Sequence, residues 1–301
     1  KTFMKRIFTV LMAILLVSSM LMSFASCGGS DESEEAWELS TVEAVYTESA
    51  TPVNKTSAEV LAYFNSLVND LKVSKPAMSY NYQINVPNDS IKVTKKGMED
   101  AEEIDESLAS INDAAVGIKD MMLKNINEKS GDIAFGADNT EYLFVKGESW
   151  TSDLTVADID YATIKEVGDN YHITIVFGDI DVNSATDPLA KAFDLRDKEE
   201  LLASDEFAKT SAYLKLNDYS ISYSGCKITA VVNRLTDEIT NLNYYKAANI
   251  VADMTGAGSL EDYGDVSVIF TLEDKADFNM TWETELPTSP LETATETAAA
   301  Q

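Results

Sequence analysis

The chain has 301 residues, of which 51 are Asp or Glu and 23 are Lys or Arg, and its formal net charge is −28. A chain this acidic has no electrostatic footprint for nucleic acid, so we expect no nucleic-acid partner. One histidine and two cysteines also exclude a multi-histidine metal site and a disulfide framework.

The first residues have the pattern of a secretory signal peptide, which we place at residues 1–26. Lys5 and Arg6 precede an apolar run from Ile7 to Met22. This run is shorter than the ~20 residues that a membrane-spanning helix needs. The polar sequence that follows it contains no stop-transfer pattern, so we expect export rather than a spanning helix.

The end of this segment, Phe24-Ala25-Ser26-Cys27, resembles the lipobox of bacterial lipoproteins, with Phe24 where Leu is usual. The resemblance implies diacylglycerol attachment to the Cys27 thiol, cleavage after Ser26, and usually acylation of the new N-terminus, for instance with palmitate. It places the protein at the cell membrane, lipid-anchored on the extracytoplasmic side. An ordinary signal peptide with a coincidental cysteine is the alternative.

Two flanking segments lack any sustained hydrophobic period. Residues 27–55, which begin with the lipidated Cys27, carry seven acidic residues and read as a disordered acidic tether. Residues 284–301 are rich in Thr and Ala and read as a disordered tail. Between them, we expect a single α+β domain at residues 56–283.

The domain begins with helical patterns. Thr56 and Glu59 form the signature of a capping box, followed by an apolar stripe that includes Val60, Phe64 and Leu71. A half-buried strand is expected from Met78 to Val86. Residues 97–129 hold the longest helical pattern, with acidic residues crowding its first turns, where the helix dipole favours them.

From Asp132 onward the hydrophobic period is mostly two, which predicts strands. Glu273–Asp277 is expected to be a turn between two of them. The expected strands lie at residues 133–135, 141–145, 171–177, 214–224, 226–233, 239–254, 266–272 and 278–282, and short helices are expected at 188–193 and 197–207. Helices followed by an antiparallel meander predict an α+β fold, with N-terminal helices packed on a curved, half-barrel-like sheet.

The second half also resembles the meanders of uncharacterised surface lipoproteins. The resemblance covers residues 131–283 as a pattern: a strand at Tyr171–Ile175 preceded by Gly168-Asp169-Asn170, the stretch Val232–Leu242, and two closing strands. More distantly, it is similar to the curved-sheet lipoprotein carriers typified by LolA and LppX. That resemblance implies a bent sheet wrapped over a helix, sometimes with an apolar cavity between them.

Few residues suggest chemistry. His172 is expected to be exposed, and Cys226 is expected to be a small buried core residue, because it shares a strand face with Ile228 and Ala230. No Gly-rich phosphate loop, nucleophile elbow or paired-cysteine spacing occurs, so we expect neither catalytic residues nor a cofactor.

A weak calcium candidate is the loop that carries Asp179, Asp181, Asn183 and Asp187, where oxygen ligands occupy four EF-hand positions. Ser184 replaces the turn glycine, and Ala190 stands where the bidentate Glu belongs. A plain polar loop between a strand and a helix is the favoured alternative.

Three functions are compatible with these features of the sequence. The first is a lipid-anchored extracytoplasmic binding protein for an apolar small molecule or an envelope protein. The second is a non-catalytic structural or interaction protein of the cell surface. The third, ranked last, is a hydrolase that uses acidic residues.

Overall fold

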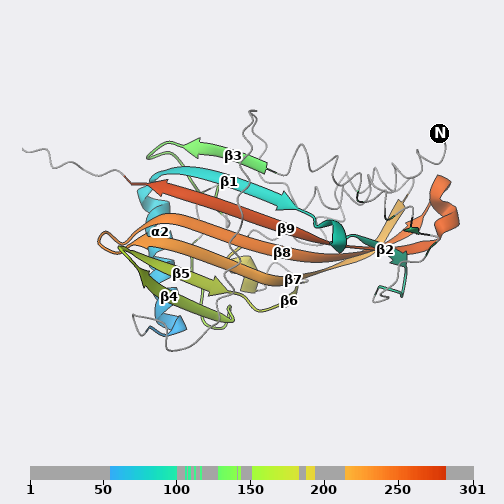
Figure 1. Ribbon diagram of the computed structural model, residues 1–301, viewed down its shortest axis with the longest axis horizontal. Coiled ribbons are helices and arrows are strands. Elements are labelled where there is room, and N and C mark those ends of the chain that lie inside the picture. Colours follow the sequence, from blue (N-terminus) through green and yellow to red (C-terminus); the bar gives the residue numbers. More distant parts are fainter. Residues whose placement is uncertain are drawn as a thin grey trace, which may run out of the picture.

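The structure is a computed structural model that describes residues 55–99, 106, 108, 109, 112, 116, 128–140, 142–143, 151–182, 188–193 and 214–282. These residues form an open, curved, nine-stranded antiparallel sheet with the α-helix α2 (Figure 1). The α+β class expected from the sequence is therefore confirmed, although strands dominate and α2 is the one long helix of the described part.

Helix α2 spans Ser57–Ser74 and begins where the sequence predicts. The Thr56 hydroxyl accepts a hydrogen bond from the Glu59 amide, while the Glu59 carboxylate accepts one from the Thr56 amide, so the capping box is complete. The helix ends at Ser74, and its C-cap residue, Lys75, adopts a left-handed conformation (φ 49°). Its apolar stripe is buried, as predicted: Val60, Leu61, Phe64, Leu67, Val68 and Leu71.

The sheet has the strand order β3-β1-β9-β8-β7-β5-β4, with β2 also paired to β9 and β6 to β7. Three consecutive long strands, β7, β8 and β9, form its centre (Figure 1). The strands are β1 (Ala77–Asn85), β2 (Lys92–Lys95), β3 (Glu128–Ile133), β4 (Tyr161–Val167), β5 (Asn170–Val176), β6 (Ile180–Val182), β7 (Leu214–Asn233), β8 (Glu238–Gly256) and β9 (Asp265–Thr281). Short 3₁₀ helices are η2 (Asn88–Ser90), η3 (Pro188–Lys191) and η4 (Gly258–Tyr263).

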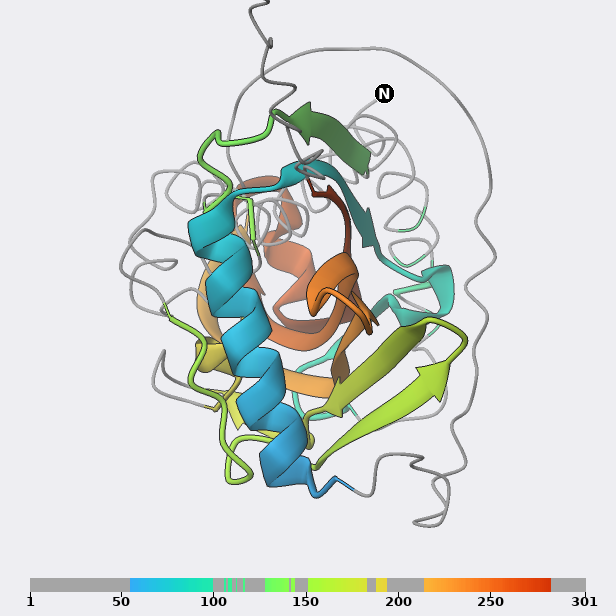
Figure 2. The ribbon, with the colours of Figure 1, turned by 90° about the vertical axis from the view of Figure 1, so that its left-hand side faces the viewer.

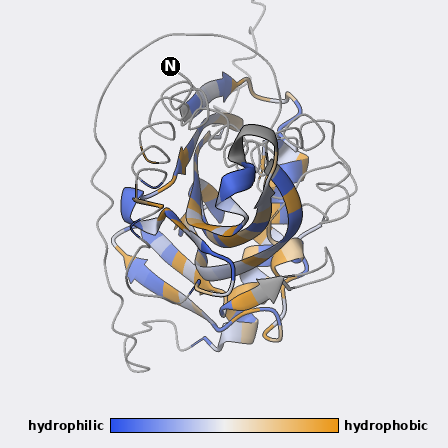
Figure 3. Cartoon of the chain, turned by 90° about the vertical axis from the view of Figure 1, so that its right-hand side faces the viewer, coloured by the Kyte–Doolittle hydropathy of each residue, from blue (hydrophilic) through white to orange (hydrophobic). Residues whose placement is uncertain are grey.

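The two faces of the sheet differ in chemistry, because successive side chains of a strand point to opposite faces. One face, which we call the covered face, packs against α2 and carries buried side chains such as Leu242, Ile250 and Phe278. The other, the outer face, carries mainly polar side chains. Figure 2 shows α2 crossing one end of the curved strands, and Figure 3 shows apolar and polar residues alternating along them.

The turn expected at Glu273–Asp277 is wrong, since β9 runs without a break from Asp265 to Thr281. The burial alternation keeps its parity through this charged stretch: Leu272, Asp274 and Ala276 all lie on the covered face and are buried. Likewise, β7 is one strand of 20 residues that passes Gly225 with an irregular register rather than a break. Charged residues alone therefore did not mark strand ends.

Other element boundaries also differ from those expected from the sequence. The helical pattern at residues 97–129 lies largely outside the described residues, but Glu128 and Lys129 belong to β3, so the helix ends before them. The strand expected at 133–135 ends at Ile133, and Phe135 is exposed in the following turn. The strand expected at 141–145 is wrong where it can be compared, since Tyr142 and Leu143 lie in a turn. Residues 141, 144–145, 197–207 and 284–301 lie outside the described residues, as does nearly all of the expected tether.

The edge strand β4 is capped by the helix. The Ser57 hydroxyl donates to the Ala162 carbonyl and accepts from the Ala162 amide, both at 3.2 Å. Free backbone groups on an edge strand invite pairing with other chains. The first turn of α2 thus satisfies the backbone of Ala162 and fixes the helix against β4.

Candidate functional site

A charged pair lies on the covered face, where the sheet is otherwise apolar and aromatic. Lys246 in β8 stands directly opposite Asp274 in β9. The Lys246 ammonium lies 3.3 Å from an Asp274 carboxylate oxygen, and the two side chains are only 9% and 6% exposed. Removing two charges from water is unfavourable unless they are paired, and here the register of β8 and β9 pairs them.

Electrostatics keep Lys246 charged. Burial alone would lower the pKa of Lys246, but the adjacent Asp274 carboxylate outweighs burial and raises the pKa above its usual value. Lys246 is therefore a cation at neutral pH and cannot act as a nucleophile.

Strand β7 supplies two more polar groups next to the pair, Tyr223 and Cys226. The register of β7 and β8 shifts between Ser224 and Lys227, and Gly225 adopts a positive φ of 63° at this bulge. The bulge places Tyr223 and Cys226 on the same covered face, 5% and 0% exposed. Burial raises the pKa of both side chains, so the Cys226 thiol stays protonated at neutral pH.

Strand β1 completes the group with Tyr82, which lies beside Ala276 and one step from Asp274 along the face. Its hydroxyl donates to the Tyr142 carbonyl, and burial raises its pKa. We call Tyr82, Tyr223, Cys226, Lys246 and Asp274 the covered-face cluster.

Aromatic side chains surround this cluster. Tyr82 packs edge-on against Phe278 (ring centroids 5.7 Å apart), and Phe278 stacks on Tyr244 (6.4 Å). Tyr244 in turn contacts Phe193, which contacts Phe177. A few fixed polar groups among aromatic and apolar side chains are typical of small-molecule sites.

The cluster suits recognition better than catalysis. It offers one cation, one anion and two hydroxyls, of which that of Tyr82 already donates to the Tyr142 carbonyl and can only accept a further hydrogen bond. Neither of its two potential nucleophiles, Lys246 and Cys226, is deprotonated at neutral pH, for the reasons given above. Its chemistry fits the polar end of a mostly apolar molecule.

The sequence did not single out Lys246 and Asp274, although a signal was present. Both stand at positions where the period-two pattern demands an apolar residue: Lys246 falls between Tyr244 and Ala248, and Asp274 between Leu272 and Ala276. Two opposite charges that break the pattern on neighbouring strands predict a buried pair. Because a turn was expected at Glu273–Asp277, Asp274 was not placed in a strand.

The calcium candidate is only partly described. Asp179 is exposed, and its carboxylate accepts a hydrogen bond from the Gly225 amide at 3.4 Å. Asp181 belongs to β6, which pairs with β7, while Asn183 and Asp187 lie outside the described residues. Calcium binding there stays a prediction. Among the residues that the structure describes, no group of three or more His, Cys, Asp or Glu side chains is arranged to hold a metal ion.

Two other expectations can be compared with the structure. Cys226 is a buried core residue with a free thiol, as predicted. His172 is exposed on the outer face of β5, also as predicted. Cys27 lies outside the described residues, and the described helices include none long and apolar enough to cross a membrane.

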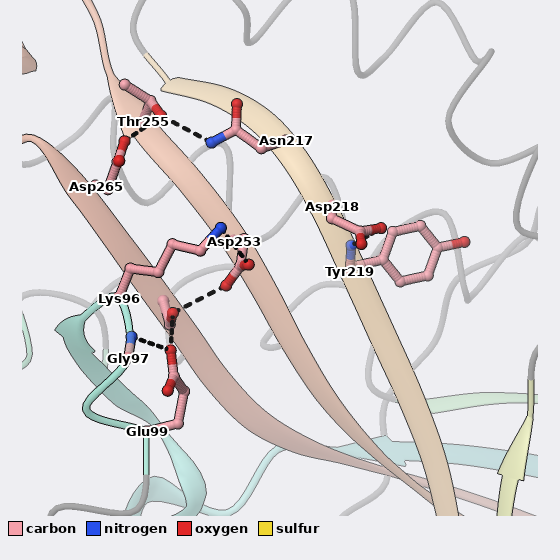
Figure 4. A network of polar contacts seen from close by, with 10 residues as sticks. Lys96, Gly97, Glu99, Asn217, Asp218, Tyr219, Asp253, Thr255 and Asp265 are labelled. Carbon is pink, nitrogen blue, oxygen red and sulfur yellow. Dashed lines mark hydrogen bonds and ion pairs between the residues drawn. The ribbon is translucent and has the colours of Figure 1, made fainter.

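A second polar network lies on the outer face at the end of the sheet opposite α2 (Figure 4). The Lys96 ammonium pairs with Asp253 at 2.9 Å, and the buried Ser267 hydroxyl lies 2.6 Å from Glu99 and 2.9 Å from Asp253. The Ser267 hydroxyl, followed by the Gly97 amide, lowers the pKa of Glu99. Because these contacts join the segment after β2 to β8 and β9, we assign the network a structural role.

Comparison with known proteins gives no relative for this chain: no family model matches it, and no curated protein or solved structure is significantly similar. Its function must therefore be inferred from its own residues.

Proposed function

We propose that this chain is an extracytoplasmic binding protein, anchored to the cell membrane by a lipid on Cys27, that takes an apolar ligand with a polar end on the covered face of its sheet. The observation that carries the proposal is the buried Lys246–Asp274 pair. A pair of apolar side chains would hold this core at least as well. Recognition of the polar end of a ligand explains why this core keeps two charged residues.

Three further features support the proposal. The hydroxyls of Tyr82 and Tyr223 lie close enough to the pair to affect, or be affected by, its charges. Aromatic rings adjoin the pair on β8 and β9. The sheet is open and curved, with α2 across one end, which is the arrangement that the carrier resemblance implies.

The main competing role is structural. Asp274 and Lys246 would then serve only to fix the register of β8 and β9, since a one-residue slip would expose every covered side chain. This role fits the second function considered from the sequence, a non-catalytic interaction protein of the cell surface. The binding role predicts that a bound molecule is lost when the charges of Lys246 and Asp274 are removed. The structural role predicts no such dependence.

The deciding experiment uses the secreted chain with Cys27→Ser, purified without detergent and analysed by native mass spectrometry. We expect a reproducible co-purifying apolar molecule. The double variant Lys246→Met/Asp274→Leu, which keeps the core filled, should lose it while remaining folded. The matched control is Lys275→Met, which removes the charge of a neighbouring residue on the outer face.

Either of two results would reject the proposal. A chain free of any small molecule would leave the interaction role. A molecule retained equally by the double variant would place its site away from the covered-face cluster.

A further inference from the structure

A continuous row of short polar side chains crosses the outer face from one edge of the sheet to the other. The strand registers align one residue from each of seven strands, in the order β4, β5, β7, β8, β9, β1 and β3. We call this set the outer polar row: Thr163, Thr174, Thr229, Asn243, Asp277, Asn81 and Ser130.

The outer polar row consists of short side chains. Outer faces of antiparallel sheets are polar by default, and Thr is enriched in strands. Here the row contains a single charge, Asp277, and every other member bears a hydroxyl or an amide. Long side chains stand instead in the adjacent register row, at Lys227, Tyr245 and Lys275.

Hydrogen bonds hold the centre of the row in place. The Asn241 amide donates to Asp277 at 2.7 Å and to Asn279 at 2.9 Å, and the Asn243 amide donates to the Asn241 carbonyl. All the members are half-buried or exposed. Groups that are already oriented lose less entropy when a partner binds.

The side-chain chemistry of the outer polar row favours some classes of partner over others. Protein interfaces have an apolar core with aromatic anchors, which this row lacks. Anionic polymers are disfavoured by the chain's net charge of −28. Hydroxyls and amides both donate and accept hydrogen bonds, so they match a partner with many uncharged hydroxyl and amide groups.

We propose that the outer polar row binds an uncharged polysaccharide with N-acetyl groups, laid across the strands. Thr163, Thr174 and Thr229 supply methyl groups for acetyl methyls together with hydroxyls for sugar hydroxyls. The Asn243 side-chain carbonyl accepts a hydrogen bond from an acetamido N–H, since the Asn243 amide nitrogen already donates to Asn241. At a strand spacing of ~4.8 Å the row spans about 29 Å, enough for several sugar units. This site is separate from the covered-face cluster and does not depend on it.

The test uses the secreted Cys27→Ser chain and the β-1,4-linked hexamer of N-acetylglucosamine as the probe, measured by isothermal titration calorimetry. Thr229→Val and Asn243→Ala should each weaken binding by about tenfold, because each removes hydrogen-bonding groups from the row. The matched control is Asn249→Ala, which removes the same kind of side chain from the same strand and face outside the row. Thermal unfolding confirms that each variant is folded.

Several outcomes would overturn the proposal. One is the absence of binding to the intact chain at millimolar hexamer. Another is unchanged affinity in both row variants, which would place the sugar elsewhere. Equal affinity for a glucose hexamer would overturn the assignment of N-acetyl groups, and tighter binding of a sulfated polysaccharide would overturn the choice of an uncharged polymer.

Discussion

At the scale of single residues, the Lys246–Asp274 pair shows how the strand period and burial act together. Both charges occupy covered-face positions, and each is tolerated only because the other stands opposite it. The pair therefore makes a strong prediction about stability, apart from any ligand.

We expect Lys246→Met to lower the free energy of unfolding by about 3–5 kcal/mol, because it leaves Asp274 buried without its cation. Asp274→Leu should have a similar effect, and the double variant should recover most of the loss. Urea denaturation of the four proteins measures this cycle. Lys275→Met, on the outer face of the same strand, should change stability by less than about 1 kcal/mol. A double variant as unstable as the single ones would contradict the pairing.

A second carboxylate should make stability depend on pH. Asp158 is 8% exposed in its side chain and accepts hydrogen bonds from the amide and hydroxyl of Thr155 and from the Lys191 ammonium. Burial alone would raise its pKa, but Lys191 and Thr155 outweigh burial and lower the pKa below its usual value of 3.8. The folded protein therefore holds the proton less tightly than the unfolded chain.

The stabilisation by Asp158 is thus complete above the unfolded pKa and is lost as the pH falls through the lower folded value. Asp158→Asn should lower the free energy of unfolding by about 1–2 kcal/mol at pH 7. The gap between variant and parent should narrow from pH 4 to pH 3 in denaturant titrations. A constant gap across this range would show that the carboxylate charge is not what stabilises the turn.

At the scale of elements, the sequence predicted helix α2 well and the long strands less well. The capping box and the apolar stripe of α2 are local signals, so its start and its buried face could be predicted. The length of β9 depends on a neighbour: its charged middle stays in the sheet because β8 presents Lys246 to Asp274. The covered-face cluster and the outer polar row likewise depend on cross-strand registers, which no single stretch of sequence reveals.

The contact between α2 and β4 can be tested through Ser57. Ser57→Ala removes both hydrogen bonds to the Ala162 backbone, and we expect a loss of about 1 kcal/mol in stability. Hydrogen exchange of the Ala162 amide should become faster, because the edge loses its partner. Ser66→Ala, at an exposed position of the same helix, is the control. Unchanged exchange at Ala162 would mean that the hydroxyl does not protect the edge.

At the scale of the whole molecule, the proposed anchor and the charge of the chain act against each other. Without the charged residues of the predicted signal peptide, Lys1, Lys5 and Arg6, the formal net charge becomes −31. An anionic membrane surface repels such a chain, so electrostatics cannot hold it. The acyl chains on Cys27 would have to supply all of the attachment, at ~0.8 kcal/mol for each buried CH₂ group.

Cys27→Ser should therefore move the protein completely from the membrane fraction to the soluble fraction, at low and at high salt alike. Salt would matter only if charged contacts contributed to attachment, because screening weakens them. The control is Cys226→Ala, which changes the other cysteine of the chain, buried in β7, and should leave the protein in the membrane fraction. Fractionation followed by immunoblotting measures both variants. If the Cys27→Ser protein stayed in the membrane fraction, some other part of the chain would have to attach it. An anionic membrane surface repels an acidic protein, so that attachment would have to be an apolar contact.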